Sequence, residues 1–326
     1  MPSVLEHLWQ LIPPFDARRV LIAPWTDDFG SYGWILLMGV LVTSACCLVG
    51  NFLMLRRLSM MGDAISHSVL PGIAAAFLLT RSRSSLAMIL GALLAGVVTS
   101  LAVETIHRRS RIKQDAAIGV VFSTLFAMGV VMISMFADRV DLDQDCVLFG
   151  EIAFVSLEPK VEWGGMVLGP ASVIRMGVVA ISVAALIGLF YKELLVSSFD
   201  AGLSRVLGIR TTLLHHGLTL VLSLVVVSAF EAVGAILVIA MLVVPGATAS
   251  LTTERLFPRL LLSLAYGALS VVFGVHFAVW LDSGIAASMV LAGGGIFCSV
   301  WTASTLQGVL ARPKSSLAAA GLRAKA

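Results

Sequence analysis

The chain has 326 residues, of which 59% are hydrophobic and 13% are charged, with a mean hydropathy of +1.00 and a formal net charge of +3. Such a composition excludes an ordinary soluble domain and is typical of a protein that crosses a membrane several times. The sequence has no G-x-x-x-x-G-K-[ST] phosphate loop and no H-E-x-x-H motif. We therefore expect a chain that neither binds ATP itself nor acts as an enzyme.

Several apolar runs of about 20 residues are each long enough to cross the hydrocarbon core of a bilayer as a helix. A spanning backbone must satisfy its own hydrogen bonds, so we expect an all-α, polytopic membrane protein with about nine transmembrane helices. The predicted spans are residues 34–55, 60–80, 86–106, 116–136, 176–195, 212–230, 232–251, 260–281 and 285–306.

Charge distribution predicts the orientation of these spans. If the loop with Arg56 and Arg57 is cytoplasmic, most of the 22 Lys and Arg residues lie on the cytoplasmic side, as the positive-inside rule favours. Residues 1–33 are then an extracytoplasmic N-terminal segment, residues 34–306 form one transmembrane domain, and residues 307–326 are a short cytoplasmic tail. The four cysteines suggest no disulfide framework.

The second predicted span contains an ionisable pair, Asp63 and His67, within the run MGDAISHSVLPGIAAAFLL. Side chains four residues apart lie on one face of a helix, and ionisable groups in a membrane usually line a polar path or bind something. A carboxylate with an imidazole suits a first-row divalent metal ion. The alternative is a pair that only forms hydrogen bonds between helices or lies at the cytoplasmic mouth.

Two prolines interrupt apolar spans in similar surroundings, LPGIAA around Pro71 and VPGATA around Pro245. A proline lacks the N–H that would bind the carbonyl four residues earlier, so both residues predict helix kinks. At Pro71 the freed carbonyl belongs to His67, which makes that oxygen a possible third ligand.

Residues 191–210, YKELLVSSFDAGLSRVLGIR, predict a short amphipathic helix with Phe199, Leu203, Val206 and Leu207 on one side. It could lie at the membrane interface or dock into a cleft of a cytoplasmic protein, and the pattern does not separate the two.

Other polar residues give weaker signals. His215 and His216 begin a span where solvated residues are usual, and a role in metal exit is the less favoured interpretation. His276 is interpreted as a hydrogen-bonding core residue and Glu231 as a hydrated residue between spans. The acidic run DLDQD at residues 141–145 would attract cations weakly at most.

Several motifs in order give the chain a family resemblance. LRRLSMMGDAISHSVLPGIAAAFLL resembles the second-helix signature of permease subunits of ABC importers for manganese, zinc or iron, a branch related to vitamin B12 and siderophore permeases. LFGEI at residues 148–152 resembles an outer-loop motif of that family, ELLVSSFDAGLSRVLGI its cytoplasmic coupling helix, and AVGAILVIAMLVVPGATASL its late kinked helix.

The resemblance implies a type II ABC importer permease fold in a bacterial inner membrane. The implied partners are a second permease subunit, identical or homologous, two cytoplasmic ATPase subunits and an extracytoplasmic metal-binding protein. Asp63 and His67 would contact the transported ion, with no permanently bound cofactor. Coupling to the ATPases would fall on the segment with Ser197, Ser198, Phe199, Asp200, Leu203, Leu207 and Gly208.

Three alternatives stay open at the sequence level. The chain could be an ABC permease for a metal chelate or cofactor, a stand-alone secondary transporter, or an intramembrane enzyme with a bound metal. Neighbouring genes for an ATPase and a binding protein would favour an importer. The sequence does not choose between manganese, zinc and iron, because all three accept a mixed imidazole and carboxylate ligand set.

Overall fold

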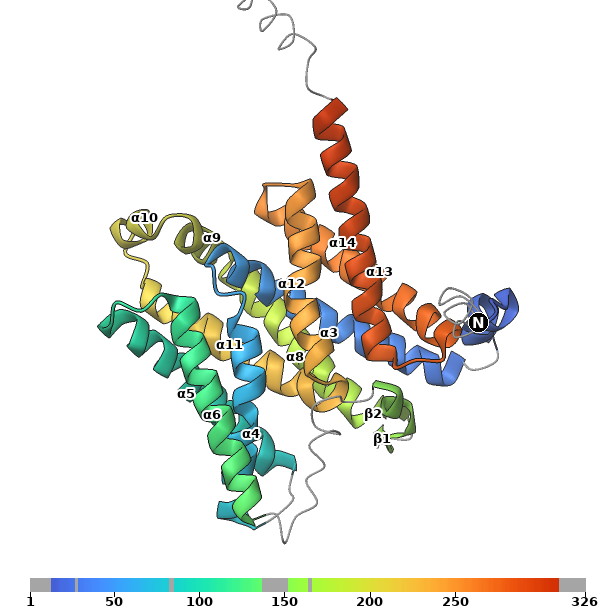
Figure 1. Ribbon diagram of the computed structural model, residues 1–326, viewed down its shortest axis with the longest axis horizontal. Helices are drawn as coiled ribbons and strands as arrows, with labels where there is room; N and C mark the ends of the chain where they lie inside the picture. Colours follow the sequence, from blue (N-terminus) through green and yellow to red (C-terminus); the bar gives the residue numbers. More distant parts are fainter. Residues whose placement is uncertain (1–12, 27–28, 82–84, 137–151, 164–165, 311–326) are drawn as a thin grey trace, which may run out of the picture.

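The structure is a computed structural model that describes residues 13–26, 29–81, 85–136, 152–163 and 166–310 (Figure 1). This part of the chain contains nine helices long and apolar enough to cross a membrane, as predicted. They are α3 (Phe29–Leu55), α4 (Met61–Thr80), α5 (Ser85–Arg109), α6 (Gln114–Phe136), α8 (Ala171–Leu189), α11 (Thr211–Val233), α12 (Ala235–Thr252), α13 (Leu256–Leu281) and α14 (Ile285–Leu310).

Helix α3 lies at the centre of the bundle, where it packs against α8, α12 and α13. Its sequence is apolar on every side, and it is the most deeply buried of the nine candidate spans. A helix without a polar face is expected to be surrounded by other helices, which is what the structure shows.

Helix α4 packs closely against α5 and α6 on one flank of the bundle. At the crossing with α5, Gly72 and Gly91 face each other. A Cβ atom added at Gly72 would lie 2.3 Å from the Gly91 carbonyl oxygen, and one added at Gly91 would lie 2.4 Å from the Gly72 carbonyl oxygen. Backbones in membranes approach this closely only where small residues meet. The glycine pair therefore fixes the position of α4, the helix that carries Asp63 and His67.

Helices α3 and α12 meet beside Pro245, which lies inside α12. Proline cannot donate to the carbonyl four residues earlier, so the Met241 carbonyl lacks its usual helical partner. The thiol sulfur of the buried Cys47 on α3 lies 3.6 Å from that oxygen. Both prolines lie within continuous helices, and the kinks at Pro71 and Pro245 stay predictions.

The Cys47 contact predicts a difference between two adjacent, fully buried cysteines. Replacing Cys47 with Ala should lower the free energy of unfolding by about 1 kcal/mol more than replacing Cys46, because only the first variant leaves the Met241 carbonyl unpaired. Thermal unfolding of both purified variants in the same detergent measures this difference. Equal losses would show that the thiol contributes packing alone.

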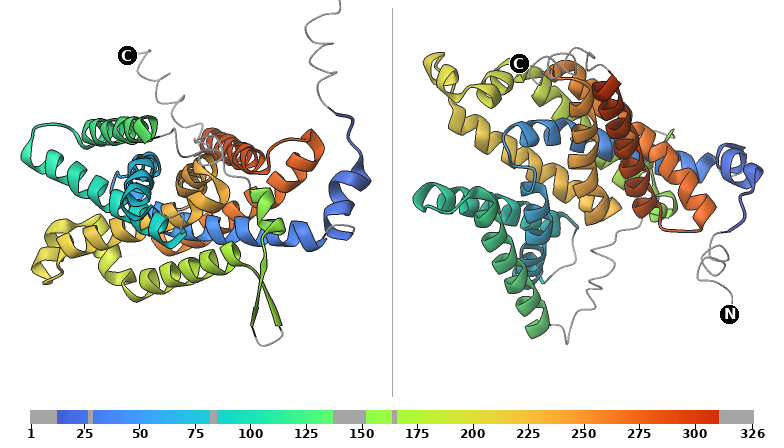
Figure 2. Two further views of the ribbon diagram at one scale, coloured as in Figure 1. Left: turned by 90° about the horizontal axis from the view of Figure 1, so that it is seen from below. Right: turned by 45° about the horizontal axis from the view of Figure 1, so that its top comes forward.

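The two ends of the bundle carry different connections. One end has the loop between α3 and α4, which we call the Arg56 end, together with the short helices α9 (Tyr191–Phe199) and α10 (Ala201–Val206). The opposite end has the 3-10 helix η3 (Ile152–Leu157) and an antiparallel hairpin of β1 (Lys160–Trp163) and β2 (Met166–Pro170). The hairpin, which the sequence analysis did not predict, extends away from the helices (Figure 2).

Several predicted span boundaries differ from the structure by three to six residues, and two of the differences have a clear local cause. The fifth span ends at Leu189 instead of residue 195, because the chain turns at Phe190 and the next residues form α9. The seventh begins at Ala235, since Gly234 adopts a φ of 78° and separates α11 from α12. A positive φ is unstrained only for glycine, so the sequence did contain a signal for this break.

Before α3, the chain forms an N-terminal strap, defined as residues 13–26 with the π-helix η1 (Arg18–Ile22) and α2 (Ala23–Thr26). It is held against α13. The Trp280 indole donates to the Pro13 carbonyl over 3.1 Å, and His276 Nδ1 lies 2.8 Å from the Val20 carbonyl oxygen. The Trp25 indole donates to His276 Nε2 over 3.4 Å. His276 is thus a hydrogen-bonding residue, as predicted.

Candidate functional site

Asp63 and His67 lie side by side near the start of α4. His67 Nε2 is 3.4 Å from Asp63 Oδ1, and the two side chains are 30% and 33% exposed, respectively. Asp63 occupies the first turn of the helix, where the unpaired N–H groups favour a negative charge. Helix geometry alone therefore brings the two predicted ligands together and leaves one side of the pair open.

Two aromatic rings of α6 form a wall beside the imidazole. The His67 ring centroid lies 5.8 Å from that of Phe122 and 5.6 Å from that of Phe126, the second in an edge-to-face arrangement. This wall restricts the imidazole on its α6 side. It also excludes polar groups from that side, so any further ligand must come from the open face.

Within the described residues, the pair offers fewer side chains than a closed metal site uses. The described residues contain no group of three or more His, Cys, Asp or Glu side chains arranged to hold a metal ion. Two side-chain ligands are too few for tight retention, since structural zinc sites use four. The open arrangement suits an ion that binds briefly and leaves.

Helix α6 packs tightly on α4 at Pro71. A Cβ atom at Gly129 would lie 2.8 Å from the Pro71 nitrogen and from its Cδ. The absence of a side chain at residue 129 therefore allows α6 to pack directly on the proline ring, one turn after His67. This contact and the aromatic wall both hold α6 against the face of α4 next to the pair.

The predicted coupling segment is two short helices and not one. Helix α9 ends at Phe199, and Asp200 caps α10, because its Oδ1 accepts from the backbone N–H groups of Gly202 at 2.8 Å and Leu203 at 2.9 Å. Aspartate favours a new helix start over continuation of the old one. Gly208 ends the segment with a φ of 74°.

Four apolar side chains of this segment are exposed. Phe199 is 62% exposed and Val206 is 85% exposed, and Leu203 and Leu207 are also exposed. We call these four residues the apolar stripe. Apolar groups that gather on an exposed face favour a membrane surface or a protein partner.

Arg56 connects this segment to the loop between α3 and α4. Its Nη2 donates to Ser197 Oγ over 2.7 Å, and its Nε donates to Ser198 Oγ over 3.2 Å. Burial lowers the pKa of the Arg56 guanidinium. The two serine hydroxyls that accept from it are uncharged. The two serines of the predicted coupling segment are therefore tied to the loop that leads into α4.

The structure reveals one acidic residue that the sequence analysis missed. Glu104 on α5 is 12% exposed at its side chain, and its Oε2 lies 3.2 Å from His216 Nδ1 and 3.7 Å from His215 Nε2. Arg108, one turn along α5, pairs with its other oxygen. An acid four residues before an arginine was a local signal for this pair. The histidines are therefore partners of a carboxylate, not simply solvated residues.

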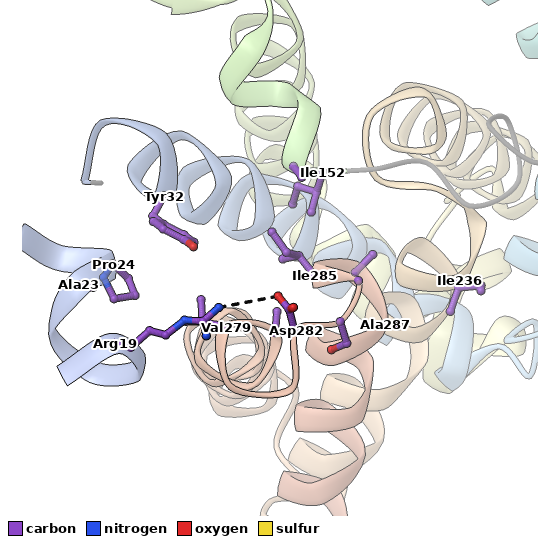
Figure 3. Close-up of a pocket in the computed structure, with 15 residues that line it drawn as sticks. Arg19, Ala23, Pro24, Tyr32, Ile152, Ile236, Val279, Asp282, Ile285 and Ala287 are labelled. Carbon is purple, nitrogen blue, oxygen red and sulfur yellow. Dashed lines mark ion pairs between the residues drawn. The ribbon is translucent and has the colours of Figure 1, made fainter. Parts of the chain in front are cut away.

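Three predicted features lie outside the described residues. They are the DLDQD run, residues 148–151 of the LFGEI motif, and the Glu231 side chain. Figure 3 shows the residues that line a cavity of about 790 Å³. It lies between the N-terminal strap and the turn from α13 to α14, where Arg19 and Asp282 point toward each other with 3.9 Å between Nη2 and Oδ1.

In the part of the chain that the structure describes, nine helices are long and apolar enough to cross a membrane, and one of them carries an open polar pair, which defines a multi-pass membrane protein. Residues 31–303 match the ABC 3 transport family, and the chain belongs to this family. The family is a transport family, so the class predicted from the sequence is confirmed.

Individual relatives agree with this assignment. The chain is 41% identical over 284 residues to the manganese transport system membrane protein MntD of Bacillus subtilis (strain 168), covering 87% of this chain and 96% of that protein. It is 40% identical over 278 residues to the zinc transport system membrane protein TroD of Treponema pallidum (strain Nichols), covering 85% and 75%. The solved structure of PsaBC from Streptococcus pneumoniae in complex with Fab superposes with a TM-score of 0.71 at 30% identity, covering 88% of this chain and 95% of that chain.

Proposed function

We propose that this chain is the membrane permease subunit of an ABC importer that moves a divalent metal ion, manganese, zinc or iron, into a bacterial cytoplasm. The observation that carries the proposal is the open Asp63–His67 pair on α4, in a chain of this transport family. The relatives named for manganese and zinc transport support a bare metal ion as the cargo.

The proposed orientation places the Arg56 end in the cytoplasm, with the N-terminal strap and the β1–β2 hairpin on the extracytoplasmic side. Arg56, Arg57 and the basic end of α5 then face the cytoplasm, as the positive-inside rule favours. In this orientation the N-terminal strap before α3 and the end of α14 lie on opposite sides of the membrane.

The ion would pass between two permease subunits, this chain and an identical or homologous partner. Each subunit would bring one carboxylate and one imidazole to the path, so that four ligands meet where one chain has two. An extracytoplasmic binding protein would release the ion into the path. Ligands from the two subunits would replace the water molecules that the ion loses. They would bind the ion weakly enough for it to leave.

Two ATPase subunits would drive the cycle from the cytoplasm. The apolar stripe supplies the surface on which they would dock, and Asp200 and Gly208 set the shape of that surface. Movement of α9 would reach α4 through the contacts of Ser197 and Ser198 with Arg56, since Arg56 precedes α4 by one short loop. Such a connection can bias a membrane domain that has two states.

Uptake measurements test the proposed cargo. Cells that express the complete system should accumulate labelled manganese, zinc or iron in an ATP-dependent manner, and cells without this permease should not. Accumulation of a metal chelate in place of every bare ion would contradict the proposal.

The apolar stripe predicts a second result. Replacing Phe199 with Ala should reduce transport and the transport-linked ATPase activity about tenfold, because the variant removes a large exposed anchor from the docking surface. Leu306→Ala is the matched control, since Leu306 is equally exposed at the cytoplasmic end of α14 and lies outside the stripe. Unchanged activity of the Phe199 variant would remove the stripe from the coupling surface.

A further inference from the structure

A second cavity, of about 410 Å³, lies at the Arg56 end between the loop after α3, the end of α5 and the start of α11. We call it the basic pocket. It is lined by Arg56, Arg57, Arg108, His215 and the two serines of α9, Ser197 and Ser198. None of the described residues that line it is acidic. The charged lining therefore includes three guanidinium groups, which only donate hydrogen bonds.

The charges around the basic pocket do not cancel. Glu104, next to the pocket, pairs with Arg108 and lies close to His215. Within the part of the chain that the structure describes, Arg56 has only the two uncharged serine hydroxyls as side-chain partners, and Arg57 has no ion pair. Two guanidinium groups thus face the pocket without a compensating carboxylate.

Burial makes this imbalance costly for Arg56. Its pKa is lowered because the guanidinium is partly removed from water. A cation in this position gains free energy from an anion that enters the pocket, because a charge-assisted hydrogen bond would replace part of the lost hydration. The planar guanidinium group of arginine can donate two hydrogen bonds at once to the oxygens of a phosphate group.

We propose that the basic pocket binds a phosphate group at the cytoplasmic surface of the membrane. The source is either the headgroup of an anionic lipid or a soluble phosphate compound. Basic pockets between transmembrane helices on the cytoplasmic side are suited to anionic lipid headgroups. Because Ser197 and Ser198 line the pocket, the bound group would lie beside the surface proposed for ATPase docking.

Calorimetric titration of the assembled importer in neutral detergent tests this site. The probes are short-chain phosphatidylglycerol, phosphatidylcholine of the same chain length, and inorganic phosphate. We expect binding of phosphatidylglycerol or of inorganic phosphate, with phosphatidylcholine bound about tenfold more weakly than phosphatidylglycerol because its headgroup is neutral overall. Competition between lipid and phosphate supports a site that recognises the phosphate group itself. Binding of one probe alone identifies the source.

Arg57→Gln should weaken the binding of the phosphate-containing probes about tenfold, because it removes a guanidinium group that lines the pocket. Arg57 forms no ion pair within the described chain, so the variant breaks no other charged contact there. Arg109→Gln is the matched control, because Arg109 is exposed as Arg57 is, neighbours Arg108 and does not line the pocket. The proposal is overturned if neither probe binds, or if both variants lose the same affinity.

A third measurement separates a ligand site from a protein interface. If the probes bind the isolated permease but not the assembled importer, a side chain of the ATPase subunit occupies the pocket, and the proposal is also overturned. The inference uses the proposed orientation but not the metal site. Its failure would leave metal uptake unchanged, so the two proposals fail separately.

Discussion

Cells that carry Asp63→Ala or His67→Ala should lose metal uptake by at least about tenfold, because each change removes one of the two side-chain ligands on α4. The remaining group cannot compensate, since the described residues offer no third metal-binding side chain next to the pair. The milder variants Asp63→Asn and His67→Gln should also fail, because the first replaces a charged carboxylate by a neutral amide and the second replaces the imidazole nitrogen by an amide group.

Uptake of labelled manganese, zinc and iron by cells with the full system measures this effect. Ser66→Ala is the matched control, since Ser66 lies between the two ligands on α4, is buried, and donates its hydroxyl to the Gly62 carbonyl of its own helix. Membrane levels and ATPase activity of every variant must equal those of the wild type. Normal accumulation by both alanine variants would remove the proposed site.

Gly72→Ala should lower the free energy of unfolding by about 3 kcal/mol, because the added methyl group would meet the α5 backbone. Its carbon would lie 2.3 Å from the Gly91 carbonyl oxygen and 2.7 Å from the Ala95 Cβ. Neither atom can rotate away, so the two helices must separate. Gly91→Ala should produce the same loss from the other side of the contact.

The control for this prediction is Gly119→Ala on α6. A Cβ atom there has nothing within 4 Å, so the variant should raise stability by about 0.5–1 kcal/mol through better helix propensity. Thermal unfolding in one detergent compares the three variants. Equal stability of the Gly72 and Gly119 variants would show that the crossing of α4 and α5 tolerates a wider separation.

The sequence predicted the spans well because each depends on a local property, the length of an apolar run. Its errors came where the chain changes direction. Residues 190–195 read FYKELL, and the prediction ran the span through Lys192 and Glu193 to the two leucines, so the turn at Phe190 was missed although the two charges were a local signal for it. The β1–β2 hairpin pairs two short segments by hydrogen bonds that no periodicity in the chain indicated.

For the site as well, contacts within one helix were predictable and contacts between residues distant in sequence were not. The closeness of Asp63 and His67 follows from helix geometry and was predictable. The aromatic wall of Phe122 and Phe126 belongs to a helix about 60 residues further along, and only packing in three dimensions brings it to His67. Glu104 had a local partner in Arg108, but its contacts with the two histidines of α11 are again distant in sequence.

The tryptophans that fasten the N-terminal strap also indicate depth in the bilayer. Indole rings favour the boundary between headgroups and hydrocarbon, where the ring is in contact with acyl chains and the N–H finds a polar partner. Trp25 and Trp280 each donate such a bond at the end of α13 that carries Asp282. We therefore expect these two rings to lie at the level where lipid gives way to water and to hinder movement of α13 along the membrane normal.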